Sequence, residues 1–255
     1  MDAAHIIRDA IEQVSQLHRE VAASSTLHAA LTAVKQFQAR RFAGTYADLL
    51  AMPEYGKAAR FFLDELYGDK DYAQRDAQFA RIAGPLQTFF PAKVVDTAVS
   101  LARLHVLTEV LDHEMAVAWE KDQGSESTDV DSIRRYMHAW RTVGRAEERT
   151  QQLDAVLKVG EELEHFTRTR GLRLMLKMMH RPAMAAGLGS LQNFLESGFD
   201  TFAGMSGQGA HAKKFLEEIR QRESLWLDRL FAPDSDACEA ALRDCLHLSD
   251  KQALS

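Results

Sequence analysis

The chain has 255 residues, of which 46% are hydrophobic and 27% charged, a composition ordinary for a globular protein with a large core. Its formal net charge of -6 provides no general attraction to nucleic acid phosphates or to anionic lipid, so we predict neither nucleic acid nor a membrane as partner. Charged residues interrupt every apolar stretch well short of the roughly 20 residues that a membrane span requires.

The two cysteines and the start of the chain bear on the compartment. Cys238 and Cys245 are seven residues apart, which is two turns of an intact helix and too far for an easy disulfide. We interpret them as reduced thiols. The start, residues 1–9, lacks the basic and then apolar segments of a standard signal peptide. We therefore predict a soluble protein of the cytoplasm.

Helical periodicity dominates the first part of the chain. Apolar residues recur at intervals of three and four over residues 6–22 and again over residues 25–41, which predicts two amphipathic helices. Gly44 is expected to break the second helix. Pro53 begins a further helix, which contains the densest aromatic run of the sequence and ends at Gly68.

Longer helices are predicted further along the chain. Pro91 begins one that ends near Glu120, and another runs from Ala146 to about His180. Two more complete a set of four long helices before residue 232. No segment alternates apolar and polar residues with the enrichment in Val, Ile and Thr that a strand requires, so no strand is predicted.

These patterns predict an all-α fold. We expect a helical bundle of four long helices with several shorter N-terminal helices packed on it. The shorter helices occupy residues 1–90, the long-helix bundle residues 91–232, and a C-terminal helix and tail residues 233–255. The three parts are expected to form one continuous globular unit.

Two polar stripes on the longest predicted helices carry side chains that bind metals. The second stripe includes a Glu-x-x-His spacing, which places a carboxylate and an imidazole on adjacent turns of one helix face. If the stripes faced each other, they would supply the oxygen and nitrogen ligands of a di-iron or manganese site. The candidate ligands are His105, Glu109, Asp112, His113, Glu162 and His165.

A second interpretation of these stripes stays open. A ferritin-like site uses two Glu-x-x-His pairs, and this chain offers one. The same residues would also suit solvated helix faces that are stabilised by ion pairs, such as Lys158 with Glu162.

Methionines surround a histidine late in the helix that follows Ala146. His180 and Met184 would be suitable axial ligands for a haem. Methionines more often fill irregular gaps in a core, and Pro182 marks a helix junction at this point. Haem binding and core packing are therefore alternative predictions for this segment.

The aromatic helix near residue 60 offers a candidate pocket or interaction site. Arg60, Asp64 and Tyr67 would lie between the N-terminal helices and the bundle. Buried arginines and tyrosines usually find hydrogen-bond partners, so the alternative role of these residues is structural.

Three segments, Phe61–Gly68, Phe194–Phe199 and Arg222–Glu223, resemble a family of uncharacterised bacterial all-helical proteins. The first segment carries the pattern Phe-Phe-Leu-x-x-Leu-Tyr-Gly, and the likeness spans nearly the whole chain. The resemblance implies a helical fold. It implies no activity, and no functional residue is carried over from it.

The sequence as a whole favours a binding or interaction protein over an enzyme. No serine lies in a Gly-x-Ser-x-Gly turn, and neither cysteine has an obvious catalytic partner. The partner would be a protein or a small molecule, and self-association into an oligomer is compatible with the sequence. The alternative is a helix-bundle protein that binds a metal or haem and performs redox or oxygen chemistry.

Overall fold

The computed structural model describes residues 2–66, 72–122, 128–169, 171–206 and 211–253. Within these residues the chain forms twelve α-helices and no strand, which confirms the all-α prediction. The helices are α1 (Ala3–Ala22), α2 (Ser25–Thr45), α3 (Ala47–Ala51), α4 (Gly56–Leu66), α5 (Ala73–Phe89), α6 (Ala92–Lys121), α7 (Asp129–Val143), α8 (Ala146–Arg168), α9 (Leu172–Ala185), α10 (Gly189–Ser206), α11 (His211–Phe231) and α12 (Ser235–Ala253).

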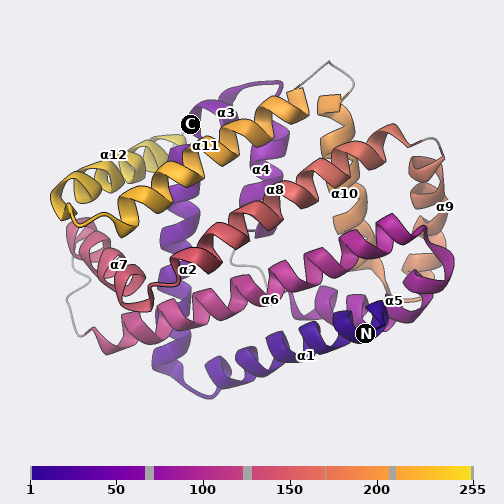
Figure 1. Ribbon diagram of the computed structural model, residues 1–255, viewed down its shortest axis with the longest axis horizontal. Coiled ribbons are helices and arrows are strands. Elements are labelled where there is room, and N and C mark those ends of the chain that lie inside the picture. The colour runs from indigo at the N-terminus through magenta and orange to yellow at the C-terminus, as the bar shows by residue number, and fades with distance from the viewer. Residues whose placement is uncertain (1, 67–71, 123–127, 170, 207–210, 254–255) are drawn as a thin grey trace.

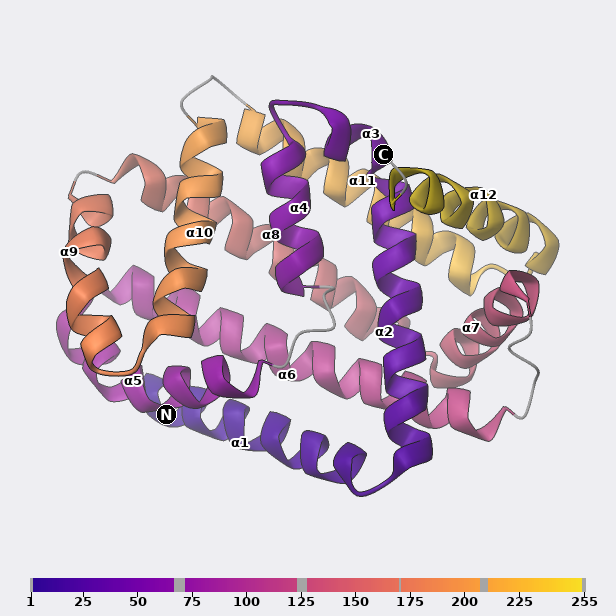
Figure 2. The same ribbon diagram turned by 180° about the vertical axis from the view of Figure 1, so that it is seen from behind.

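Helix α6, with 30 residues, crosses the long dimension of the molecule and has α1 alongside it (Figure 1). In Figure 2, α2 rises from the end of α1, crosses α6 and reaches α12. The two N-terminal helices have 20 and 21 residues and are as long as α11, which has 21. The long helices of the core therefore extend beyond the four expected in residues 91–232.

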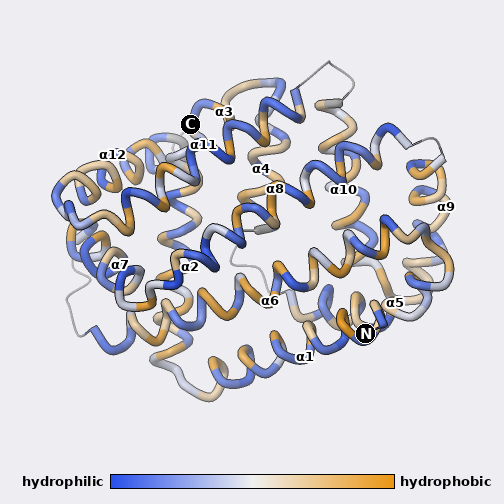
Figure 3. Tube along the Cα trace, viewed as in Figure 1, coloured by the Kyte–Doolittle hydropathy of each residue, from blue (hydrophilic) through white to orange (hydrophobic). Residues whose placement is uncertain are grey.

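Three apolar clusters hold the helices together. One joins α2, α6, α7, α11 and α12 around Trp119 and Tyr136, a second joins α2, α4, α8, α10 and α11 around Phe62 and Phe215, and the third joins α1, α5 and α6 around Ile7. Hydrophobic and hydrophilic residues follow each other closely along most helices (Figure 3), as expected where one face of each helix is buried.

Side-chain caps fix the beginnings of several helices close to the predicted positions. The Asp2 carboxylate accepts from the Ala4 amide at the start of α1, and the Ser24 hydroxyl accepts from the Leu27 amide at the start of α2. Helix α6 begins directly after Pro91, as predicted. Each cap provides an acceptor for an amide that has no partner inside its helix.

Gly44 lies inside α2 instead of ending it. A Cβ atom at this position would lie 1.9 Å from the carbonyl oxygen of Cys245 in α12. The absence of a side chain is therefore what allows α12 to pack directly on the backbone of α2.

The helix predicted from Ala146 to His180 is divided in two. Helix α8 ends at Arg168, and α9 begins after Gly171, whose φ of +84° lies in the left-handed region. Only glycine adopts this conformation at little cost, so Gly171 changes the chain direction between the two helices.

No helix in the described part of the chain is both long and apolar enough to cross a membrane. Cys238 and Cys245 are free and buried, which confirms that they do not pair.

Candidate functional site

A cavity of about 160 Å³ lies between eight of the helices, α2, α4, α5, α6, α7, α8, α10 and α11. Its lining residues extend in sequence from Gln38 to Leu227. A cavity of roughly 150 Å³ in a protein core accommodates one benzene molecule. The space therefore suits a molecule built on a single ring.

Aromatic side chains make up much of the cavity wall. The guanidinium carbon of Arg75 lies 4.1 Å from the ring centre of Tyr72 and 4.6 Å from that of Phe194, where its charge interacts favourably with both ring faces. The other aromatic lining residues are Phe42, Phe62, Phe79, Tyr136 and Trp140.

Buried ion pairs also border the cavity. Arg41 of α2 donates from Nη1 to Glu223 Oε1 over 3.0 Å and from Nη2 to Glu223 Oε2 over 2.8 Å. At another part of the wall, Arg75 Nη1 lies 3.2 Å from Glu65 Oε2. Such pairing is required here because an isolated charge in a protein interior has a large desolvation cost.

A further group of charges lies where α6 faces α1 and α2. Lys35 Nζ donates to both oxygens of Glu109 over 3.0 and 3.2 Å, and His18 Nε2 lies 3.2 Å from Glu109 Oε2. Burial alone would raise the pKa of Glu109, but the hydrogen bond with His18 and the charge of Lys35 outweigh it and lower the pKa to about 2. The same hydrogen bond raises the pKa of His18.

Asp112 lies one turn further along α6 and has the opposite tendency. Burial raises the pKa of its carboxyl, although the charge of Lys35 opposes this. Gln38 Nε2 donates to Asp112 Oδ1 over 3.1 Å. The surroundings therefore shift the pKa values of two acids on one helix face in opposite directions: the pKa of Glu109 is lowered and that of Asp112 is raised.

Helices α7 and α8 add hydrogen-bond donors to the wall. The guanidinium carbon of Arg149 lies 4.2 Å from the ring centre of Trp140, which is one turn from Tyr136. Burial raises the pKa of Tyr136 to about 12, so its hydroxyl keeps its proton throughout the physiological pH range.

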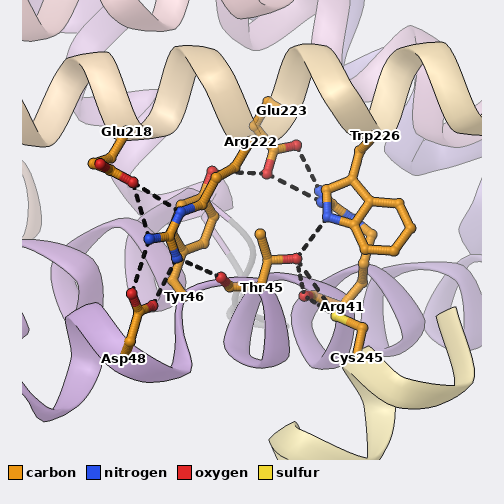
Figure 4. Close-up of polar contacts among 9 residues, drawn as sticks. All are labelled: Arg41, Thr45, Tyr46, Asp48, Glu218, Arg222, Glu223, Trp226 and Cys245. Atoms are coloured by element: carbon orange, nitrogen blue, oxygen red, sulfur yellow. Dashed lines mark hydrogen bonds and ion pairs between the residues drawn. The ribbon is translucent and has the colours of Figure 1, made fainter. Parts of the chain in front are cut away.

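A polar network fixes α11 against α2 beside this cavity (Figure 4). The Tyr46 hydroxyl donates to Glu223 Oε1 over 3.0 Å, in addition to the two bonds from Arg41. Arg222, the neighbour of Glu223, donates to both oxygens of Asp48 over 2.6 and 2.8 Å. Arg222 and Glu223, consecutive residues of α11, thus bind side chains at the C-terminal end of α2, at Tyr46 and in α3.

Thr45 connects this network to α12. Its hydroxyl accepts from Trp226 Nε1 over 2.8 Å and donates to the Arg41 carbonyl over 2.8 Å, and the same carbonyl accepts from Cys245 Sγ over 3.1 Å (Figure 4). Contacts among α2, α11 and α12 therefore set the positions of Arg41 and Glu223 in the cavity wall.

Comparison with models of known protein families matches residues 17–237 to a domain of unknown function, DUF8198. The chain belongs to this family. The matched range contains every residue that lines the cavity. Comparison with curated proteins finds no significant match. None of the solved structures matches significantly.

The family match covers most of the chain, as the resemblance described above implied, and the family is uncharacterised. The segments that carried the resemblance meet at the cavity. Phe62 and Glu65 from the first, Phe194 from the second and Glu223 from the third all belong to its wall.

Half of the predicted metal ligands come together at the cavity. His105, Glu109 and Asp112 all line it, but each side chain contacts a different partner, and His105 Nε2 lies 2.8 Å from Asp76 Oδ2. Among the described residues, no group of three or more His, Cys, Asp or Glu side chains is placed to hold a metal ion.

The other three predicted ligands lie elsewhere. Glu162 of α8 lies 2.9 Å from Lys93 at the start of α6, 16 residues or about 24 Å along the helix from Glu109. His165 is exposed, and His113 Nε2 lies 3.7 Å from Glu20 Oε2. Helices α6 and α8 are in contact, but they pack so that Glu162 lies beside the start of α6. This register keeps the two predicted stripes apart.

The predicted haem ligands lie on the surface. His180 Nδ1 is within 3.0 Å of both carboxylate oxygens of Glu196, and these two side chains line a surface depression of about 420 Å³ between α9 and α10. Met184 is 48% exposed and does not line that depression. The two residues therefore do not face a common enclosed space.

The predicted site near residue 60 is also on the surface. Arg60 and Asp64 line an open depression of about 690 Å³ where α4 meets α10. The Asp64 carbonyl accepts from the Tyr72 hydroxyl over 3.0 Å. Tyr67 lies outside the described residues.

Sequence reasoning did not single out Tyr136, Trp140 or Arg149. The first two lie one helical turn apart, a signal for a shared face that was available in the sequence. Their alignment with Arg149 depends on the geometry of the turn at Gly144, and helical periodicity does not predict that geometry.

Proposed function

We propose that the chain is a small-molecule-binding protein whose ligand occupies the cavity between the eight helices named above. The observation that carries this proposal is the cavity itself, which has the volume of a single ring and a wall of aromatic and buried charged side chains. Small-molecule sites typically combine an apolar wall with a few polar groups that orient the ligand.

Stability alone gives little reason for such a wall. Replacing a buried ion pair by apolar residues of similar volume is often neutral or stabilising, and an empty space forfeits the dispersion contacts that packed side chains would make. The Arg41–Glu223 pair and the open volume beside it both fit a site that is preorganised for a ligand.

Thermal unfolding in the presence of ring-sized probes tests the proposal. We expect toluene or phenol, at a concentration far above its dissociation constant, to raise the Tm by about 5 °C, because a ligand that binds only the folded state stabilises it.

The matched control fills the cavity. Val156 of α8 lines the space, and Val156→Phe adds a ring to it. We expect this variant to have a Tm at least equal to that of the wild type without probe and to lose the response to both probes. If neither probe changes the Tm of the wild type, or if both proteins respond equally, the cavity is not a binding site for such molecules.

A further inference from the structure

Helix α9 contributes little to the core and exposes large apolar side chains. It lies at one end of the molecule, in contact with α10 and α8 (Figure 1 and Figure 2), and its only buried residue is Ala183. Leu174 and Met178 are each 62% exposed, and Met179 and Met184 are exposed as well. Four of the nine exposed large hydrophobic side chains in the described part of the chain thus belong to this one helix. Such a concentration of exposed apolar surface is typical of an interaction site.

The charged side chains of α9 are all basic. Its sequence contains no Asp or Glu. Arg173 Nη2 lies 2.8 Å from Asp200 Oδ1 of α10. Lys177 and Arg181, in contrast, are exposed and form no ion pair with any residue that the structure describes. Both line the depression between α9 and α10, so two cations are available there to a partner.

The apolar and basic side chains form neighbouring stripes on α9. Leu174 and Met178 lie about one helical turn apart, and so do Lys177 and Arg181. With about 3.6 residues per turn, the two stripes lie side by side. Methionine adapts to irregular surfaces, which suits it to contact with another helix.

From this pattern we propose that α9 binds an amphipathic helix of a partner protein that carries acidic side chains beside its apolar face. The apolar face packs on Leu174 and Met178, and the carboxylates pair with Lys177 and Arg181. Docking of an amphipathic helix on an apolar surface is a common mode of peptide recognition, and complementary charges select the partner. This surface is separate from the cavity, so it does not depend on the proposed ligand.

Two other occupants agree less well with the charges and the shape of this surface. A second copy of the chain that docked through its own α9 would bring like charges together. An anionic membrane surface is flat, whereas the depression is concave and is also lined by Glu196 and Asp200, which such a surface would repel.

A fluorescent peptide tests the proposal on the full chain. The probe has about 18 residues, with leucines at intervals of three and four and glutamates at the other positions. We expect its fluorescence anisotropy to rise and saturate as the protein is added. The same peptide with lysines in place of the glutamates is expected to bind about tenfold more weakly.

Charge reversal locates the basic stripe. Lys177→Glu combined with Arg181→Glu is expected to weaken binding of the acidic peptide about tenfold. Lys213→Glu combined with Lys214→Glu reverses two exposed charges of α11 and is expected to leave the affinity unchanged.

A matched pair of leucine variants tests the apolar stripe. Leu174→Gln is expected to weaken binding of the acidic peptide about fivefold because it removes apolar contact area. Leu225→Gln makes the same change at an exposed position of α11 and is expected to have no effect on binding. Since both leucines are exposed, both variants should keep the wild-type Tm.

The proposal is wrong if the acidic peptide shows no saturable binding, or if the α9 and α11 variants bind it equally well. Two further results would assign α9 to another occupant. One is sedimentation of the wild-type protein, but not of the α9 charge-reversal variant, with vesicles of phosphatidylcholine and phosphatidylserine. The other is a wild-type dimer, detected by light scattering, that the same variant dissociates.

Discussion

Single residues in this protein are placed by charges that lie far away in the sequence. Glu109 was predicted as a metal ligand on the pattern of its own helix, and its position at the cavity wall agrees with a polar stripe on α6. Its partners, His18 and Lys35, come from α1 and α2. No pattern within α6 predicts them, because the partner helices are chosen by the packing of the whole chain.

The pH dependence of stability is the first test at this scale. The ordinary pKa of a glutamate, 4.5, falls to about 2 at Glu109, so its contribution is present above pH 4.5 and is lost as the pH falls towards 2. A difference of this size corresponds to roughly 3 kcal/mol. Denaturant unfolding at several pH values should find Glu109→Gln less stable than the wild type at pH 6 by about this amount, with the difference shrinking towards pH 2. A difference that is independent of pH would contradict this account.

Neighbouring arginines of α2 provide a second test. Arg41 is 6% exposed in its pair with Glu223, so Arg41→Met leaves a buried carboxylate without its cation and is expected to cost about 3–5 kcal/mol. Arg40 pairs with Asp129 and Asp250 at 35% exposure, and Arg40→Met is expected to cost less than about 1 kcal/mol. Chemical denaturation measures both, and equal costs would contradict the distinction between the buried pair and the surface pair.

At the scale of helices, the sequence predicts ends better than contacts. The starts of α2 at Ser25 and of α6 after Pro91 depend on local signals, and both were predicted closely. Gly44 and Gly171 were misread because their roles depend on geometry: one permits the approach of a helix some 200 residues away, and the other takes a positive φ inside a segment with continuous helical periodicity.

The contact between α2 and α12 can be tested at Gly44. A methyl group there collides with the Cys245 carbonyl, so we expect Gly44→Ala to lower the free energy of unfolding by about 3 kcal/mol, because two backbones have to separate. Gly204→Ala in α10 is the matched control, since a Cβ there meets nothing within 4 Å. The control is expected to be stabilising by about 0.5–1 kcal/mol. A stable Gly44→Ala protein would mean that α12 does not pack on α2 in this way.

At the scale of the whole molecule, the all-α class follows from helical periodicity, whereas the cavity does not. Its wall combines eight helices over residues 38–227, and its shape depends on how closely each pair of helices approaches. The polar stripe with His105 and Asp112 identified one side of that wall. Another part of the wall, with Tyr136 and Trp140, has a sequence pattern ordinary for core packing, and only the assembled helices show that it lines the cavity.

The central claim is that a small molecule occupies the cavity, and the indole N–H signals of the three tryptophans test it most directly. Trp140 lines the cavity and its N–H lacks an acceptor in the described chain, whereas Trp226 is bonded to Thr45 outside the cavity. In a ¹H–¹⁵N NMR titration with phenol, we expect the Trp140 signal to shift and saturate while the Trp226 signal stays in place. An unchanged Trp140 signal at the highest phenol concentration, or equal shifts of all three signals, would contradict the account.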